Sequence, residues 1–379
     1  MQIDIIGGGI CGLTTALALE KKGYEPNIYE QALELKPVGA GIILAANAMN
    51  VYRHLGIEEE IKAKGIVLKK LNITNIKLEA FSTINLEHFK TKYDLQSIVI
   101  HRGKLQEILL NNLKNTNINL GYRLEKLTKE KDSYVVNFDN GKTITSTILL
   151  GADGIYSQVR NFITTKNTIR NSNQICWRGV TQYKLPPEYK NELNEAWGKG
   201  DRFAFVAFEE NKLYWYAVKS FKETSAIFMK KEIRSYYAHY APIVQKIIES
   251  TPLEAIHATE MEDLNPINIW YNSNACLIGD AAHATTPNMG QGACQAIEDA
   301  YMIAECLHEY KSSKAFEEFQ KRRLKTAHTI VNQSWTIGKI SHWKNPIAIY
   351  LRNMVLSKTP KIWNIRQLEN LFQLNTKEI

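Results

Sequence analysis

Short apolar runs, glycine-rich turns and longer amphipathic segments alternate along the first part of the chain. Residues 3–6 are apolar and predict a strand, and residues 10–22 have the pattern of a helix that Gly23 caps. Residues 26–30 predict a second strand. Because a strand, a helix and a further strand follow one another, we expect a parallel sheet with helices on its faces.

Later segments return to this pattern. Residues 105–113 predict a helix, and residues 134–138 and 142–150 predict two strands joined by a turn at Asn140-Gly141. Residues 148–152 then rejoin the parallel sheet. A short buried strand over 275–278, a helix over 292–308 and a long helix over 316–340 complete the expected order.

The middle of the chain has a different pattern of residues. Apolar and polar residues alternate over 203–208 and 213–219, and aromatic residues are dense between 175 and 269. Alternation of this kind is typical of an antiparallel sheet with one buried face. We therefore predict an α/β protein in which residues 1–70, 91–172 and 266–330 form a discontinuous first domain. Residues 71–90 and 173–265 form a second domain, and residues 331–379 form C-terminal helices.

Composition narrows the class of protein. The chain has 379 residues and a net charge of +8, which favours anionic ligands, but no basic stripe interleaved with aromatic residues. We therefore expect no nucleic-acid partner. Five cysteines without a CxxC pair argue against a disulfide framework and against a zinc site, so no metal is predicted. Neither a signal peptide nor a transmembrane segment is visible, which predicts a cytoplasmic protein, monomeric or homodimeric.

The first chemical motif lies between the first strand and the first helix. Gly7, Gly9 and Gly12 fit the GxGxxG pattern, in which the glycines permit a tight turn, approach of the backbone to a pyrophosphate, and close helix–strand packing. The helix N-terminus supplies free N–H groups for the phosphates. Glu30 ends the second strand, where a carboxylate accepts hydrogen bonds from a ribose hydroxyl. The segment therefore predicts a dinucleotide site.

Two further motifs identify the dinucleotide. Gly151-Ala152-Asp153-Gly154 ends one strand, and the segment 279–287 ends another and continues into Gly290-Gln291-Gly292. Together with the glycine fingerprint, these motifs resemble the three signatures of the FAD-dependent aromatic hydroxylases, the family of 4-hydroxybenzoate hydroxylase. The resemblance extends over most of residues 1–340. It implies a Rossmann-like FAD-binding domain and a second domain that supplies the substrate pocket.

The resemblance also assigns roles to individual residues. Asp280 would bond the ribityl hydroxyls of FAD, Arg102 would reach the phosphates or the ribityl chain, and Asp153 would help to hold the cofactor. A loop would follow the isoalloxazine edge, and the next helix would point its N-terminus at the flavin N1–C2=O region. This loop contains Pro287, Gly290, Gln291 and Gly292. His283 is interpreted as a structural side chain.

The family chemistry follows from the same resemblance. NAD(P)H would reduce the flavin, dioxygen would form a flavin C4a-hydroperoxide, and its distal oxygen would pass to an electron-rich ring. These hydroxylases lack a separate nicotinamide domain, which accounts for the single GxGxxG pattern. The expected partners are therefore a small aromatic or purine-like ring substrate, dioxygen and NAD(P)H.

The second domain offers candidates for the substrate pocket. Arg202 and Tyr214 resemble an arginine–tyrosine pair of FAD-dependent urate hydroxylases, which implies that Arg202 pairs with a urate anion and Tyr214 positions it. The segments 39–42 and 47–48 fit the same subfamily. Further candidates are Trp177, Arg178, Phe203, Phe205, Phe208, Trp215 and Tyr216. For most of the aromatic residues, packing within the sheet is the simpler interpretation.

Several alternatives remain open at this point. Tetracycline-inactivating flavin monooxygenases and hydroxylases of salicylate-like acids share the same FAD motifs. An FAD-dependent dehydrogenase or reductase, or a non-catalytic flavin redox module, would use the same fold without oxygen transfer. Residues 347–363 mix apolar and basic residues. They predict either a helix at a membrane surface or, as we favour, a helix packed against the FAD domain or a second subunit.

Overall fold

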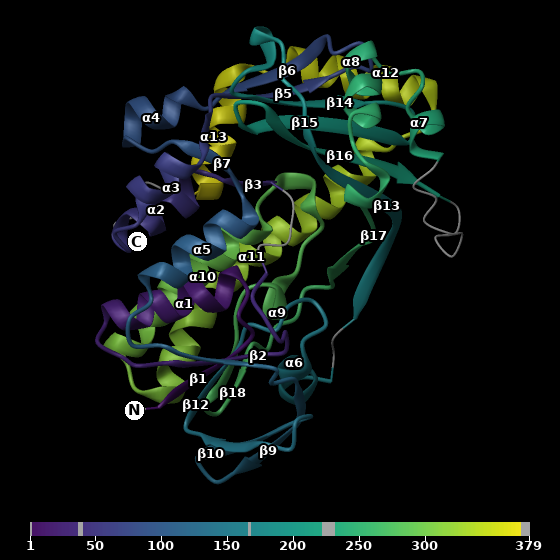
Figure 1. Ribbon diagram of the computed structural model, residues 1–379. Coiled ribbons are helices and arrows are strands. Elements are labelled where there is room, and N and C mark those ends of the chain that lie inside the picture. Colours follow the sequence, from purple (N-terminus) through teal and green to yellow (C-terminus); the bar gives the residue numbers. More distant parts are fainter. Residues whose placement is uncertain (1, 37–40, 166–167, 222–231, 373–379) are drawn as a thin grey trace.

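A six-stranded sheet forms the lower part of the molecule in Figure 1. The computed structural model describes residues 2–36, 41–165, 168–221 and 232–372. The strand order is β18-β19-β12-β1-β2-β8, and all pairs are parallel except β18 with β19. The strands are β1 (Ile3–Ile6), β2 (Asn27–Glu30), β8 (Asn117–Leu120), β12 (Ile148–Gly151), β18 (Tyr271–Asn272) and β19 (Ala275–Leu277). The predicted parallel sheet is confirmed.

Helices α1 (Ile10–Lys21), α5 (Arg102–Asn112) and α10 (Gly292–Glu309) pack together beside this sheet. Nine residues of α1 are buried, so this helix is enclosed by its neighbours rather than lying at the surface. A small sheet of order β11-β10-β9 contains β9 (Leu124–Glu130), β10 (Ser133–Phe138) and β11 (Thr143–Ser146).

The predicted return of residues 148–152 to the parallel sheet is confirmed, but the continuous strand predicted over 142–150 is wrong. It is two strands, since β11 pairs with β10 while β12 pairs with β1. Thr147 separates them, and the hydroxyl of Ser146 donates to the carbonyl oxygen of Ile148 at 2.9 Å. This bond turns the chain from the small sheet into the parallel one.

A seven-stranded sheet forms the upper part of the molecule, in the order β17-β13-β16-β15-β14-β5-β6. Its strands are β5 (Lys70–Thr74), β6 (Ala80–Asn85), β13 (Ile169–Gln182), β14 (Glu192–Trp197), β15 (Asp201–Glu209), β16 (Lys212–Ser220) and β17 (Ile256–Leu264). The expected antiparallel pairing holds except between β14 and β5, which are parallel. Segments 70–85 and 169–264 thus share one sheet, and the domain boundaries themselves stay a prediction.

Between the two large sheets lies a three-stranded sheet of order β3-β7-β4. It contains β3 (Gly41–Leu44), β4 (Ile66–Leu68) and β7 (Ser97–His101), with α2 (Ala46–His54), α3 (Glu58–Lys64) and α4 (Glu87–Tyr93) nearby. The short elements of the chain are α6 (Gln158–Ile163), η1 (Pro187–Tyr189), α7 (Ile233–Tyr236), α8 (Pro242–Glu249), η3 (Leu253–Ala255), α9 (Asp280–His283) and η4 (Pro287–Met289).

Helix α11 (Ser312–Ser341) connects the two halves of the molecule (Figure 1). Its 30 residues span about 45 Å at 1.5 Å per residue. Near its end, the carbonyl oxygen of Gly338 accepts from Gln174 of β13 at 3.1 Å, and Trp335 stacks beneath Arg170. Helices α12 (Pro346–Lys358) and α13 (Lys361–Phe372) then pass over β6. In the described part of the chain, no helix is long and apolar enough to cross a bilayer.

Buried charges link α9, α10 and α11. Arg323 of α11 donates to Asp299 at 2.7 Å and to Glu298 at 2.5 Å, and all three side chains are almost fully buried. Asp299 also accepts from the ring of His283 at 2.5 Å and from the backbone N–H of Gly279 at 2.9 Å. The expected structural role of His283 agrees with this contact. The network fixes the turn that begins α9.

We predict that Arg323→Met destabilises the protein by about 3–5 kcal/mol, because two carboxylates would remain buried without their cation. Arg322→Met is the matched control, since the neighbouring Arg322 pairs with Glu309, which is 46% exposed, and its loss should change little. Urea unfolding followed by fluorescence measures both variants. Equal stability of the two variants would contradict a structural role for the network.

Candidate functional site

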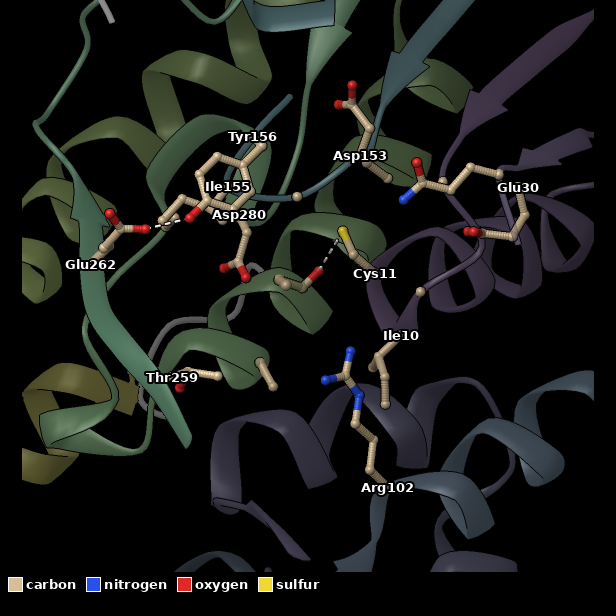
Figure 2. A pocket seen from close by; sticks show the side chains of 18 of the residues that line it. Ile10, Cys11, Glu30, Arg102, Asp153, Ile155, Tyr156, Thr259, Glu262 and Asp280 are labelled. Atoms are coloured by element: carbon tan, nitrogen blue, oxygen red, sulfur yellow. Dashed lines mark hydrogen bonds between the residues drawn. The ribbon is translucent and has the colours of Figure 1, made fainter. Parts of the chain in front are cut away.

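A cavity of about 1160 Å³ opens between the parallel sheet and the seven-stranded sheet. It brings together predicted residues from segments far apart in the sequence (Figure 2). These are Gly7, Gly9, Glu30, Arg102, Asp153, Tyr214, Asp280 and Pro287. The described part of the chain contains no group of three or more His, Cys, Asp or Glu side chains placed to hold a metal ion.

The glycine loop has the geometry that a pyrophosphate requires. Gly7 has a φ of +109°, and a Cβ atom there would lie 2.4 Å from the carbonyl oxygen of Ala152. A Cβ atom on Gly12 would lie 2.0 Å from the carbonyl oxygen of Gly7, so the helix can approach the strand only without a side chain. Gly9 is the N-cap of α1 and faces open space, and it offers no side-chain acceptor to the first N–H groups. These donors therefore remain available to an anion.

Glu30 connects the second strand to this loop. Its Oε2 accepts from the backbone N–H of Gly8 at 2.6 Å, and its Oε1 accepts from that of Ala32 at 2.8 Å. A carboxylate has about four acceptor positions, so two remain for the hydroxyls of a ribose. The residues of the loop thus fit the adenosine half of FAD.

Asp280 and Arg102 face the cavity from opposite sides (Figure 2). Asp280 begins α9 directly after Gly279, whose φ is +59°, and Arg102 begins α5. Surrounding protein raises the pKa of the Asp280 carboxyl by desolvation, whereas the charges of His283 and Arg102 act to lower it. A partly desolvated carboxylate of this kind is suited to accept from ligand hydroxyls.

Asp153 organises the turn after β12. Its carboxylate accepts from Ser157 at 2.5 Å and from the backbone N–H groups of Gln158 and Val159 at 2.8 and 3.1 Å. These bonds cap α6 while the residue lines the cavity. Direct binding of FAD by Asp153 stays a prediction.

The loop expected at the isoalloxazine edge contains η4 and the start of α10. Pro287 lines the cavity, and Gly290, with a φ of +64°, turns the chain toward the N-cap residue Gln291. Gln291 is buried and accepts from the side chain of Asn47 at 3.1 Å. Gly290, Gln291 and Gly292 do not line the cavity themselves. They place the N-terminal part of α10, of which Ala293 and Ala296 reach it.

The seven-stranded sheet forms the opposite wall with side chains of β13, β16 and β17. Tyr214 and Arg178 line it, and Arg178 donates to the hydroxyl of Thr259 at 3.2 Å. A Cβ atom on Gly41 would lie 2.8 Å from that of Tyr214, so β3 packs closely on this wall. Gly39 and Ala40, from the same motif, lie outside the described residues. The sequence interpretation missed His257 and Thr259, and the only signal for them was the short alternation of apolar and polar residues over 256–259.

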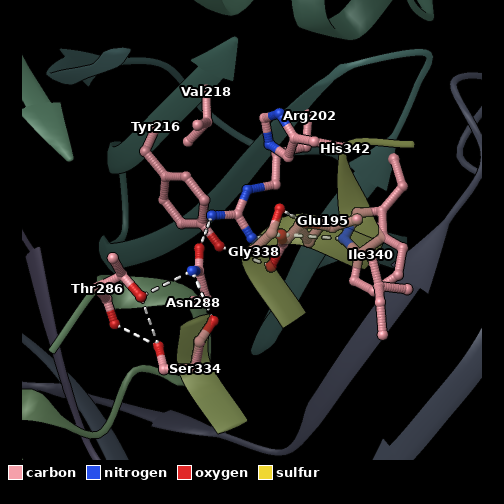
Figure 3. A network of polar contacts seen from close by, with 12 residues as sticks. Glu195, Arg202, Tyr216, Val218, Thr286, Asn288, Ser334, Gly338, Ile340 and His342 are labelled. Carbon is pink, nitrogen blue, oxygen red and sulfur yellow. Dashed lines mark hydrogen bonds and ion pairs between the residues drawn. The ribbon is translucent and has the colours of Figure 1, made fainter. Parts of the chain in front are cut away.

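Arg202 does not line this cavity and is 1% exposed. Its guanidinium pairs with Glu195 at 2.9 Å and also contacts Asn288 (Figure 3). Asn288 belongs to the loop over 287–292, which we call the flavin loop after its expected role. Glu195 accepts further bonds from the hydroxyl of Tyr216 at 2.8 Å and from the indole of Trp197 at 3.0 Å. The roles of Arg202 and Tyr214 toward a substrate stay predictions.

Many of the other candidate residues of the second domain belong to its core. Trp177, Phe203, Phe205, Phe208 and Trp215 are at most 2% exposed. Phe203 and Trp215 stack with ring centroids 5.5 Å apart, and Trp215 donates to Thr251 at 2.9 Å. These rings therefore pack the sheet, as the simpler interpretation had it.

The fold and the site define a flavoprotein with an FAD cradle beside a sheet-walled pocket. The FAD binding domain family matches residues 1–334. Aurachin C monooxygenase/isomerase of Stigmatella aurantiaca is 35% identical over 360 residues, covering 94% of each chain. The 2-heptyl-3-hydroxy-4(1H)-quinolone synthase of Pseudomonas aeruginosa is 28% identical over 381 residues, covering 98% of each chain. The chain therefore belongs to the FAD-dependent monooxygenases.

Solved structures agree in fold. Klebsiella pneumoniae HpxO, complexed with FAD and uric acid, superposes with a TM-score of 0.90 at 22% identity, covering 99% of this chain and 97% of that chain. The tetracycline destructase Tet(55) reaches a TM-score of 0.76 at 18% identity, covering 100% of this chain and 97% of that chain. The expected architecture and the cofactor FAD are confirmed.

We predict that Asp280→Ala raises the Kd for FAD about ten- to a hundredfold, because a hydrogen bond to a charged group contributes about 1.5–3 kcal/mol. Flavin fluorescence during titration of the apoprotein measures it. Asp132→Ala, an exposed change between β9 and β10, is the control and should bind FAD normally. Stoichiometric, tight FAD in Asp280→Ala would exclude the residue from the cofactor site.

Proposed function

We propose that the protein hydroxylates a neutral, fused aromatic ring of the 4-quinolone class. The overall reaction would consume one ring C–H, dioxygen, NAD(P)H and a proton, and would yield the ring C–OH, NAD(P)⁺ and water. Bound FAD supplies the redox chemistry that connects the nicotinamide, dioxygen and the ring. The observation that carries the proposal is the pair of donors, Tyr214 and Arg178, on the cavity wall, while Arg202 outside the cavity is already paired with Glu195.

The pairing of Arg202 with Glu195 leaves this arginine unavailable to an anionic substrate. In the urate interpretation, Arg202 offers its positive charge to the substrate, but here the carboxylate of Glu195 already neutralises this buried guanidinium. Tyr216 and Trp197 also donate to this carboxylate, so it is held in place. Moving Glu195 away would leave a buried charge unpaired, which is costly. A neutral ring in the cavity, which neither Arg202 nor Glu195 lines, requires no change in this pair.

Two donors on the cavity wall suit a polarised carbonyl oxygen. Burial raises the pKa of Tyr214, although the charge of Arg178 opposes that rise, and the phenol stays protonated and able to donate. Arg178 offers guanidinium N–H groups from the neighbouring strand. We propose that both orient the substrate through its ring carbonyl, while the surrounding sheet and flavin loop exclude water.

The relatives support the same substrate class. The names of the two relatives that are 35% and 28% identical refer to aurachin C and to a 3-hydroxy-4-quinolone. Urate hydroxylases are 24% identical. Urate remains the second candidate, because Arg202 and Tyr214 lie on the adjacent strands β15 and β16, as in the urate interpretation. In the register of these strands, Arg202 is opposite Val218 and Tyr214 is opposite Val206.

The direct test compares 2-heptyl-4(1H)-quinolone with urate in NADH and NADPH oxidation by the FAD-loaded protein. We expect the quinolone to stimulate oxidation, to gain one oxygen atom from ¹⁸O₂ by mass spectrometry, and to release little hydrogen peroxide. Stimulation by urate alone, with coupled hydroxylation, would overturn the proposal. Nicotinamide oxidation that proceeds without oxygen transfer to either ring would instead favour a dehydrogenase or reductase.

We further predict that Glu195→Gln shifts the preference toward anionic rings. The change keeps the shape of the side chain but frees the charge of Arg202. The KM for urate should therefore fall at least about tenfold relative to the quinolone, since hydrogen bonds to charged groups contribute about 1.5–3 kcal/mol. Glu192→Gln on the same strand, whose carboxylate pairs with Lys70, is the control. An unchanged ratio of the two KM values would remove the pair from substrate selection.

A further inference from the structure

Helix α12 presents its apolar face to solvent. Asn345 caps its start by accepting from the N–H groups of Ile347 and Ala348 at 2.9 and 3.2 Å, and Pro346 occupies the first turn. On the inner side, Arg352 is buried and donates to the carbonyl oxygens of Ser341 and Ile340 at 3.0 and 3.3 Å. The helix is therefore anchored through an arginine, and this contact fixes which face points outward.

The outward face is formed by Ile347, Tyr350, Leu351 and Val355, at helical spacings of three and four residues. Ile347 is 71% exposed, Tyr350 is 68% exposed and Val355 is 60% exposed. Trp343 before the helix and Trp363 of α13 add further exposed rings. We call these six residues the outer apolar face. A contiguous exposed apolar face with aromatic residues is typical of an interaction surface. The prediction that this segment packs against the FAD domain or a second subunit stays a prediction, and within the described chain this face has no cover.

The charged residues of the segment 343–368, which contains the outer apolar face, have one sign. Lys344, Lys358 and Arg366 are exposed, and within residues 343–368 no acidic residue occurs. Among the described residues, none of these three cations has an acidic partner. Two copies of the chain packed by this face around a twofold axis would bring the cations together, which opposes self-association. An anionic surface complements them instead.

We propose that the outer apolar face docks the protein on the surface of an anionic lipid bilayer. The exposed Trp and Tyr rings suit the headgroup level, the aliphatic side chains enter the acyl boundary, and the lysines meet the anionic headgroups. The helix lies along the surface and does not cross it, since α12 has 13 residues. The inference does not depend on the proposed substrate.

The test is co-sedimentation of the FAD-loaded protein with vesicles of phosphatidylcholine and phosphatidylglycerol, and with vesicles of phosphatidylcholine alone. We expect binding to the mixed vesicles that weakens as salt is added. Ile347→Ser with Val355→Ser should abolish it. Lys344→Gln and Lys358→Gln should each lower the partition coefficient about fivefold, as a basic residue near an anionic surface contributes about 1 kcal/mol.

Matched controls lie at the other end of the molecule. Lys126→Gln and Lys129→Gln on β9, far from α12 in Figure 1, remove the same charge and should not change vesicle binding. Ile269→Ser removes an exposed apolar side chain elsewhere and should also have no effect. Light scattering measures the oligomeric state of the same samples.

Three results would overturn the proposal. The first is absence of binding to the mixed vesicles by the wild-type protein. The second is equal loss of binding in the control variants, which would make the attraction a property of net charge alone. The third is a wild-type dimer that Ile347→Ser with Val355→Ser converts to a monomer, which would assign the outer apolar face to a second copy of this chain.

Discussion

The carboxylate of Asp299 holds the turn on which the cofactor site depends. It accepts from Arg323, from His283 and from the backbone N–H of Gly279, and is fully buried. Burial alone would raise the pKa of this carboxyl, but the charges of His283 and Arg323 hold it below its usual range. Gly279 directly precedes Asp280, so an ionised, fixed Asp299 determines where the Asp280 carboxylate points. Asp280 is thus positioned by a buried charge that does not itself line the cavity.

A second buried charge, the guanidinium of Arg202, is neutralised within the protein. Arg202 is fixed by Glu195, and the same guanidinium contacts Asn288 in the loop next to the cavity. The arginine therefore connects the seven-stranded sheet with η4 and lies outside the cavity. Under the proposed function, this internal neutralisation would select against anionic rings without a change of fold.

The sequence predicted best what local backbone geometry requires. Gly7 and Gly12 could be assigned because only glycine permits those approaches, and Glu30 because its position follows from the strand that precedes it. The partner of Arg202 could not be predicted, since Glu195 lies on β14, a strand without a clear pattern of its own. The strand over 142–150 was misjudged because its break depends on two different sheets, which are long-range partners. His257 and Thr259 were missed because acidic residues interrupt the alternation of β17.

The C-terminal helices and the pocket are physically continuous. Arg352 of α12 lies 5.2 Å from the ring centroid of Trp197, and the indole of Trp197 donates to Glu195. Glu195 in turn pairs with Arg202, which contacts the flavin loop. Contact alone does not establish coupling, which needs an element with two arrangements. The continuity still constrains the molecule, because any shift of α12 on its anchor would disturb the pair of Arg202 with Glu195. A rigidly anchored α12 is therefore consistent with a face that binds a surface and leaves the substrate site undisturbed.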